Sequence, residues 1–431
     1  MARVMKDSGI EWIGEIPETW NTDRLQWHLN EVNVSNSPIQ SENVLSLTIE
    51  AGVIPYEEKG NQGNKSKENY EEYKLAYPDT LVVNSMNVII GAVGISKYFG
   101  CVSPVYYVFK VTEGTDLRYI YYLFTNVGFQ KEMRKHAKGI LEIRLRISSG
   151  DMLKLSIPNP SYEEQHRIAD FLDRKCAEID AVIEKTKATI EEYKKLKQSV
   201  ITEAVTKGIR GNRPMKDSGI EWIGEIPDEW KTAPLKAFID ILPGYAFSSD
   251  DFSTESGIPL LRGINVAPNG IRWDETVRYN LPITEQLIPF QLQEGDIVVG
   301  LDRPWISDGT RIAWITKDDV PSLLLQRVCR IRAKESTDLR WVYHWIASSA
   351  FQESLSTETT GVSVPHISTK QIGNFVIALP SPEEQNEVCN FLDERCAALD
   401  TLIAKKTALL TELETYKKSL IYEYVTGKKE V

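Results

Sequence analysis

One stretch of this chain occurs twice, and that repeat limits what the chain can fold into. Residues 160–207 and 380–427 align without a gap, and 21 of their 48 positions are identical. Both copies open on a Pro-Ser-x-Glu-Glu-Gln run. So many identities at a fixed offset indicate an internal duplication with two equivalent long segments.

The repeated stretch has the pattern of a long helix. Ser161 lies three residues before Glu164, which is the spacing of a capping box, and the second copy keeps both residues. Pro382 suits a first helical turn, and Gly208 and Gly427 suit helix ends. Two largely apolar rows recur at steps of seven in each copy. The first copy has Leu172, Ile179, Thr186, Tyr193 and Val200 in one row and Cys176, Ile183, Ile190, Lys197 and Ala204 in the other. The second copy has Leu392, Leu399, Lys406, Leu413 and Leu420 beside Cys396, Ile403, Leu410, Lys417 and Tyr424.

Such heptads over several turns are typical of a coiled coil. A helix of about 45 residues is roughly 65 Å long. We expect the two helices to pack on each other, antiparallel, as a spacer. The alternative is that each helix packs separately on a globular core.

A second repeat precedes each region of unlike sequence. Residues 5–20 and 215–230 are identical at 14 of 16 positions, including two tryptophans in each copy. Tryptophan buries a large area and often anchors a segment. We interpret each copy as a structural clasp rather than a ligand site.

Between these repeats the sequences of the two halves diverge. They have in common only a succession of short predicted strands and turns. Short apolar runs predict strands at 80–83, 88–90 and 105–109, and at 259–262, 296–299, 311–315 and 328–331. Helices are predicted at 117–138 and 339–354. The predicted organisation is a clasp (1–20), a variable α/β domain (21–155), a helix with a joint (156–213), a second clasp (214–230), a second variable domain (231–377) and a second helix (378–431).

Composition excludes some classes of protein. The 431 residues carry a net charge of −11, and no segment is strongly basic, which counts against a freestanding nucleic-acid binder. No apolar run approaches the length of a membrane span, and no signal core follows Met1. The five cysteines form no CxxC pair, so we expect a reducing, cytoplasmic setting.

Some motifs superficially resemble those of catalytic or metal sites, but they lack the residues or the spacing that such sites need. Asn159-Pro160-Ser161-Tyr162 resembles the Asn-Pro-Pro-Tyr of amino-methyltransferases, but the second copy, Leu379-Pro380-Ser381-Pro382, keeps only the helix cap. The five histidines have no metal-site spacing. We therefore expect no catalytic site and no metal site in this chain.

Three features together indicate one family. They are the twin Gly-Ile-Glu-Trp-Ile-Gly-Glu-Ile-Pro segments at 9–17 and 219–227, the twin Pro-Ser-x-Glu-Glu-Gln openings, and Phe-Leu-Asp at 171–173 and 391–393. With them the chain resembles, over its whole length, the DNA-specificity (S) subunits of type I restriction–modification systems. The resemblance implies an α+β fold, with two α/β target-recognition domains separated by two long antiparallel coiled-coil helices in a pseudo-two-fold repeat.

The resemblance also implies a function and partners. Each domain would read one half of a bipartite, asymmetric double-stranded DNA target, and the helices would set the spacer and dock methyltransferase subunits. Two methyltransferase subunits would bring S-adenosylmethionine, and restriction subunits would bring ATP and Mg; no cofactor is expected in this chain. The alternative is a non-catalytic adaptor that binds two different proteins. A self-contained methyltransferase or nuclease is the third hypothesis.

Base readout favours Arg, Lys, Asn, Gln and Ser on protruding loops. In the first domain the candidates for DNA binding are Asn84, Ser85, Asn87, Lys138, Arg144 and Arg146. In the second domain they are Arg262, Arg303, Trp305, Arg311, His366, Ser368 and Lys370. Each charged candidate is alternatively a solvated surface residue, and Trp305 is alternatively a core residue.

Overall fold

The computed structural model describes residues 3–60, 69–86, 92–138, 145–268, 270–307, 309–334, 337–359 and 365–431. The predicted strand at 88–90 lies outside these residues. The chain divides into two compact units, one of Met1–Thr186 with Ala408–Val431 and one of Lys187–Thr407. Each unit contains a variable domain and part of both long helices.

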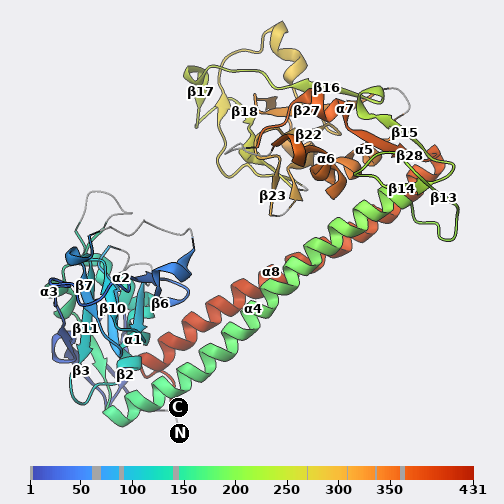
Figure 1. Ribbon diagram of the computed structural model, residues 1–431. Coiled ribbons are helices and arrows are strands. Elements are labelled where there is room, and N and C mark those ends of the chain that lie inside the picture. The colour runs from blue at the N-terminus through green and yellow to red at the C-terminus, as the bar shows by residue number, and fades with distance from the viewer. Residues whose placement is uncertain are drawn as a thin grey trace. The chain divides into compact units, whose positions relative to one another are not determined.

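The two repeated stretches form the long helices α4 (Tyr162–Lys207) and α8 (Pro382–Val425). In the first unit the start of α4 shares a core with the end of α8, and in the second unit the end of α4 adjoins the start of α8 (Figure 1). The helices are therefore antiparallel, as predicted. Gly208 and Gly427 follow the helix ends with φ of +74° and +70°, which confirms the predicted stops.

Two lysines in the heptad stripe find partners across the helix pair. Lys197 of α4 pairs with Asp400 of α8 at 2.7 Å, and Lys417 of α8 pairs with Asp180 of α4 at 2.6 Å. These two ion pairs are repeat equivalents, one in each unit. They explain how the stripe tolerates a charge, and they show the pseudo-two-fold relation of the two helices.

The clasps fasten the starts of these helices. Ser161 Oγ accepts a hydrogen bond from Glu164 N at 3.3 Å, as the cap predicts. The Glu164 carboxylate does not return to the cap; it accepts a bond of 2.8 Å from Trp20 Nε1 and pairs with Arg3. Trp20 is 1% exposed, so this tryptophan is a buried anchor beside the start of α4. In the second unit Trp230, Glu384 and Arg213 repeat this arrangement.

The first domain is built on a four-stranded antiparallel sheet in the order β4-β11-β8-β9. The strands are β4 (Leu29–Glu31), β11 (Tyr106–Val111), β8 (Thr80–Asn84) and β9 (Val93–Ser96). Two-stranded pairs surround it within the described residues: β1 (Met5–Asp7) with β2 (Glu15–Pro17), β3 (Asn21–Arg24) with β12 (Ser156–Asn159), β5 (Leu45–Thr48) with β6 (Gly52–Pro55), and β7 (Lys74–Ala76) with β10 (Gly100–Val102).

The second domain has a sheet of the same kind, in the order β16-β27-β22-β25. Its strands are β16 (Ile239–Pro243), β27 (Val328–Ala333), β22 (Ile297–Gly300) and β25 (Ile312–Trp314). A second sheet runs β17 (Phe252–Ser253), β21 (Arg278–Tyr279), β18 (Ile258–Leu261) and β26 (Leu323–Leu324). The pairs are β13 (Met215–Asp217) with β14 (Glu225–Pro227), β15 (Lys231–Pro234) with β28 (Val376–Leu379), β19 (Val266–Ala267) with β20 (Gly270–Ile271), and β23 (Trp305–Ile306) with β24 (Gly309–Thr310).

The shared sheet corrects the expectation that the variable domains have in common only a succession of short strands and turns. In each domain one inner strand, β8 or β22, is called here the middle strand. It is buried on both faces of the sheet, so its sequence is a continuous apolar run. Leu81 and Val83 of β8 face the core shared with the helices, while Val82 faces a separate cluster. Ile297 and Val299 of β22 alternate with Val298 in the same way. One face of the sheet therefore packs on an equivalent core in both domains. The opposite face is covered by β elements that differ between the two domains.

Both predicted domain helices are broken in two, which corrects their predicted extents. Residues 117–138 give α1 (Leu117–Thr125) and α2 (Val127–Lys135), because Asn126 caps α2 by accepting a bond from Gly128 N at 2.7 Å. The second region gives α5 (Leu339–Ala347) and α6 (Ser349–Thr359). Short helices α3 (Ser149–Leu153) and α7 (Thr369–Asn374) precede the strands β12 and β28 that lead into the long helices.

Candidate nucleic-acid interface

A cavity lined by four arginines opens in the second domain. It has a volume of about 440 Å³. The loop after β22 contributes Asp302 and Arg303, and the turn before β27 contributes Arg327. Arg262 follows β18, and Arg311 precedes β25. Loops far apart in the sequence thus place four guanidinium groups and one carboxylate around one hollow.

Two of these arginines donate to backbone carbonyls. Arg311 donates to the Gly263 carbonyl at 3.1 Å, and Arg262 donates to the Glu275 carbonyl. Burial lowers the pKa of Arg311, and the positive charge of Arg303 lowers this pKa further. Like charges therefore already crowd the cavity, which favours an anionic or acceptor-rich ligand.

Asp302 links two segments at the edge of the cavity. Its carboxylate lies 3.1 Å from Arg327 Nη1 and 2.6 Å from His366 Nδ1. The backbone of Asp302 also pairs with that of His366, and Arg303 N donates to the Pro365 carbonyl at 2.8 Å. The structure therefore brings Arg303 and His366, two predicted residues far apart in sequence, to one place.

The other candidates of this domain have different surroundings. Trp305 is partly buried and packs against the main core of its unit. Ser368 caps α7, where its Oγ accepts from Gln371 N at 3.2 Å. Lys370, in the first turn of α7, is exposed.

In the first domain the candidates divide between buried and exposed positions. Asn84 is buried and accepts a bond from Met86 N at 3.0 Å, and Ser85 is buried with its Oγ donating to the Val105 carbonyl at 2.7 Å. Lys138 and Arg146 are exposed and paired through both backbone bonds, of 2.8 and 3.0 Å. Asn87 and Arg144 lie outside the described residues.

Equivalent hydrogen bonds place the two candidate surfaces at the same point of the shared scaffold. Ile147 N donates to the Ser85 carbonyl at 3.3 Å, and Ile367 N donates to the Leu301 carbonyl at 2.9 Å. In each domain, therefore, the segment before the short helix α3 or α7 joins the loop after the middle strand. Arg146 and His366 stand at corresponding positions.

The family model of the type I restriction modification DNA specificity domain matches residues 28–192 and 227–414, which are most of the chain. The chain belongs to this family. It is 32% identical over 319 residues to the type I restriction enzyme MjaVIII specificity subunit of Methanocaldococcus jannaschii, across 73% of this chain and 71% of that one. It is 35% identical over 193 residues to the EcoAI specificity subunit of Escherichia coli, across 44% of this chain and 32% of that one.

A solved structure on complex assembly and conformational transition of the type I R-M system has the same fold. It matches with a TM-score of 0.69 and 14% identity, over 96% of this chain and 99% of that chain. The predicted architecture of a type I specificity subunit, with two target-recognition domains and two long antiparallel helices, is thereby confirmed. The role of this family is recognition of the DNA target.

In the described ranges of this specificity subunit, none of the helices combines the length and the apolar sequence that a membrane span requires. The same residues contain no group of three His, Cys, Asp or Glu side chains that could hold a metal ion.

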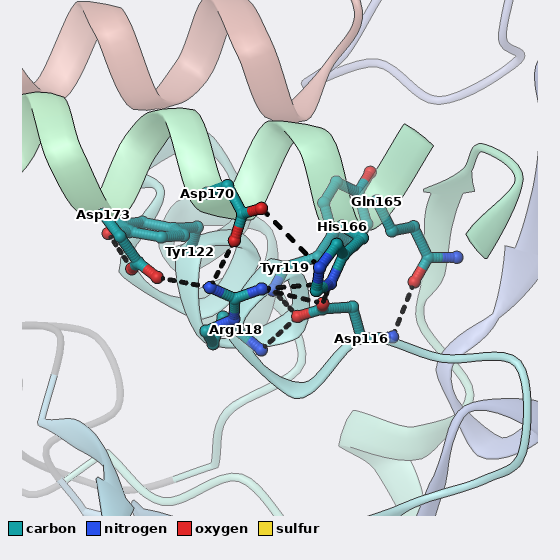
Figure 2. Close-up of polar contacts among 8 residues, drawn as sticks. All are labelled: Asp116, Arg118, Tyr119, Tyr122, Gln165, His166, Asp170 and Asp173. Atoms are coloured by element: carbon teal, nitrogen blue, oxygen red, sulfur yellow. Dashed lines mark hydrogen bonds and ion pairs between the residues drawn. The ribbon is translucent and has the colours of Figure 1, made fainter. Parts of the chain in front are cut away.

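A polar network that the sequence analysis missed joins the first target-recognition domain to α4 (Figure 2). Arg118 of α1 pairs with Asp170 at 2.7 Å and with Asp173 at 2.8 Å, while Asp116 accepts from His166 at 2.8 Å. Burial would raise the pKa of Asp116, but bonds from His166 and from two backbone amides outweigh burial and lower it. The network fixes the domain on the helix.

The second domain has an equivalent network with fewer carboxylates. Arg340 of α5 contacts Asn386, Asn390 and Asp393 of α8, and His344 lies 3.2 Å from Asp393. The signal for both networks was present in the sequence as a Thr-Asp-Leu-Arg run at 115–118 and again at 337–340. Arg327, the other residue missed, had no such signal.

Proposed function

We propose that this specificity subunit reads a bipartite, asymmetric double-stranded DNA target, one half with each domain. The observation that carries the proposal is the contrast between the two faces of each central sheet. The helix-side face repeats in both domains, whereas the β elements and loops on the other face differ. Two unlike surfaces on equivalent supports read unlike half-sites, and a palindromic target would need two equal ones.

The proposed contacts lie at the loop after the middle strand and at the segment before α3 or α7. Exposed cations support this placement, namely Lys138 and Arg146 in the first domain, and Arg303, Arg327 and Lys370 in the second. Asn84 and Ser85 are buried at the end of β8 and bond to Met86 N and to the Val105 carbonyl. Arg262 and Arg311 line the cavity, and Asp302 holds His366 beside it. Trp305 packs on the core of the unit, and Ser368 caps α7.

Because the net charge of the chain is negative, the proposal requires partner subunits that contact the DNA phosphates. Phosphate contacts dominate DNA affinity, and a chain with a net charge of −11 supplies few of them. Two methyltransferase subunits, which would bind S-adenosylmethionine, would supply part of these contacts. Restriction subunits with ATP and Mg would join the full complex.

Exposed apolar residues on the long helices support docking of two identical partners. Val182 and Leu196 of α4 are 46% and 49% exposed, and their repeat equivalents Leu402 and Tyr416 of α8 are 41% and 54% exposed. All four occupy the g position of the heptad in which Cys176 is a, and reversed helices bring g positions to one side. Each unit thus offers one apolar pair, Val182 with Tyr416 or Leu196 with Leu402. Two pairs at equivalent positions suit two copies of a methyltransferase subunit.

A domain exchange tests the proposed reading of the target. Replacing residues 21–155 with the corresponding domain of another type I specificity subunit should change one half of the methylated sequence and leave the other half intact. Sequencing of methylated adenines in cells that carry the complete system gives the result. A change in both halves, or in neither, would refute the reading.

A charge on the exposed apolar pair tests the proposed docking. Tyr416→Glu should weaken assembly with the methyltransferase subunits about tenfold or more, because it buries a carboxylate in an apolar contact. Thr415→Glu is the matched control, since Thr415 is exposed at the neighbouring f position. Sedimentation of the purified subunits distinguishes the two; equal assembly of both variants would remove this surface from the proposal.

A further inference from the structure

The four arginines of the cavity in the second domain do not have equal roles. Arg262 and Arg311 donate to backbone carbonyls and are half-buried, so they form the wall. Arg303 and Arg327 are exposed. Of these two, Arg327 is paired with Asp302, whereas Arg303 has no ion pair within the described residues. Arg303 is therefore the cation that is free to meet a ligand.

The backbone holds Arg303 in an unusual conformation. Its φ is +45°, and that of Arg327 is +72°, a left-handed region that non-glycine residues other than Asn and Asp seldom adopt. Hydrogen bonds fix both sites: Arg303 N donates to the Pro365 carbonyl at 2.8 Å, and the Arg327 carbonyl accepts from Leu301 N at 2.9 Å. Residues kept in such conformations cluster at functional sites.

The surroundings of Arg303 restrict the chemistry of that ligand. Its charge is repelled by Arg311, and the one carboxylate of the cavity, Asp302, is already shared by Arg327 and His366. A contact to a phosphate needs only a charge, which a mobile side chain supplies. A guanidinium on a fixed backbone suits a ligand that needs orientation, and the O6 and N7 atoms of guanine accept its two parallel bonds.

We propose that Arg303 is a specificity-determining residue that reads a guanine in the half-site of the second domain. This inference rests on the proposed function, because it requires that this domain face the major groove. Asp302 is a positioning residue that holds Arg327 and His366 beside Arg303. Arg262 and Arg311 keep the cavity open and positive.

The test uses the full chain assembled with its methyltransferase subunits and a DNA library in which each position of the target is varied. Arg303→Ala should reduce the preference for guanine at one position of one half-site by roughly tenfold to a hundredfold. Arg303→Lys should keep the salt dependence of binding but not the preference, because lysine lacks the two-pronged geometry. Arg272→Ala, at an exposed arginine outside the cavity lining, should leave the preference unchanged.

Two outcomes would overturn the inference. One is an unchanged guanine preference in Arg303→Ala, and the other is an equal loss of affinity for every sequence, which marks a phosphate contact. If the unaltered complex reads a two-part target, either of these results refutes only the inference about Arg303. If the unaltered complex reads no two-part target, the proposed function itself fails. Thermal unfolding of each variant confirms that the exposed substitution leaves the fold intact.

Discussion

Asp116 shows how one carboxylate at the junction of domain and helix can have two tasks. It caps α1, accepting bonds from Arg118 N at 2.8 Å and Tyr119 N at 3.2 Å, and it also binds His166 of α4 at 2.8 Å. Asparagine caps helices as well as aspartate does, so Asp116→Asn removes the charge and keeps the cap. The variant isolates the electrostatic part of the junction.

We expect Asp116→Asn to lower the free energy of unfolding by about 1–3 kcal/mol near pH 7. Because the folded pKa of Asp116 is lowered, its stabilisation is present above the ordinary carboxylate pKa and is lost as pH falls through the folded pKa. The difference from the unaltered chain should therefore shrink below about pH 4. Urea unfolding at several pH values measures it. The control is His166→Asn, which removes the histidine partner of Asp116 and introduces the residue that stands at the equivalent position 386. An unchanged free energy of unfolding in that variant would show that His166 contributes nothing.

At the scale of the helices, the two equivalent ion pairs differ in exposure. The Lys197 side chain is 10% exposed, whereas that of Lys417 is 29% exposed. Asp400→Ala leaves a buried ammonium unpaired and should cost about 1–3 kcal/mol, less than a fully buried pair because Asp400 is partly exposed. Asp180→Ala should cost under about 1 kcal/mol. Thermal unfolding of the two variants tests this order, and the reverse order would contradict it.

The long helices were predictable because their signals are local. A heptad, a Ser cap and a glycine stop act within a few residues of each other, so α4 and α8 follow from the sequence. Each domain helix was predicted as one continuous helix, whereas a single residue divides each into two: Asn126 ends α1, and Ser348 ends α5. The repeated Thr-Asp-Leu-Arg run could have revealed that the two domains share a scaffold.

The candidate site was less predictable, because its members meet only in the folded chain. Arg303 and His366 were predicted as separate loop residues. They meet through the contact of Asp302 with His366 and through the backbone bond from Arg303 to Pro365. Arg327 precedes an apolar strand and carries no pattern that distinguishes it from a solvated charge. Its place in the cavity depends on how the loops after β18 and β22 pack beside it, which no local pattern encodes.

At the scale of the whole molecule, the proposed function gives the long helices the task of a ruler. Inserting one heptad into both helices, between Thr186 and Lys187 and between Thr407 and Ala408, leaves the contacts inside each compact unit intact. Seven residues add about 10 Å. The unread spacer between the half-sites should then lengthen by about three base pairs, at 3.4 Å for each pair.

Rotation adds a second consequence of the same insertion. A heptad nearly preserves the face that each helix presents, whereas three base pairs turn a half-site by almost a third of the double helix. The lengthened complex should therefore methylate the longer site more weakly than the unaltered complex methylates its own. Seven residues inserted in the joint at 208–214 serve as the control and should leave the spacer unchanged. A spacer that stays constant after insertion in both helices would mean that the helices do not set the distance.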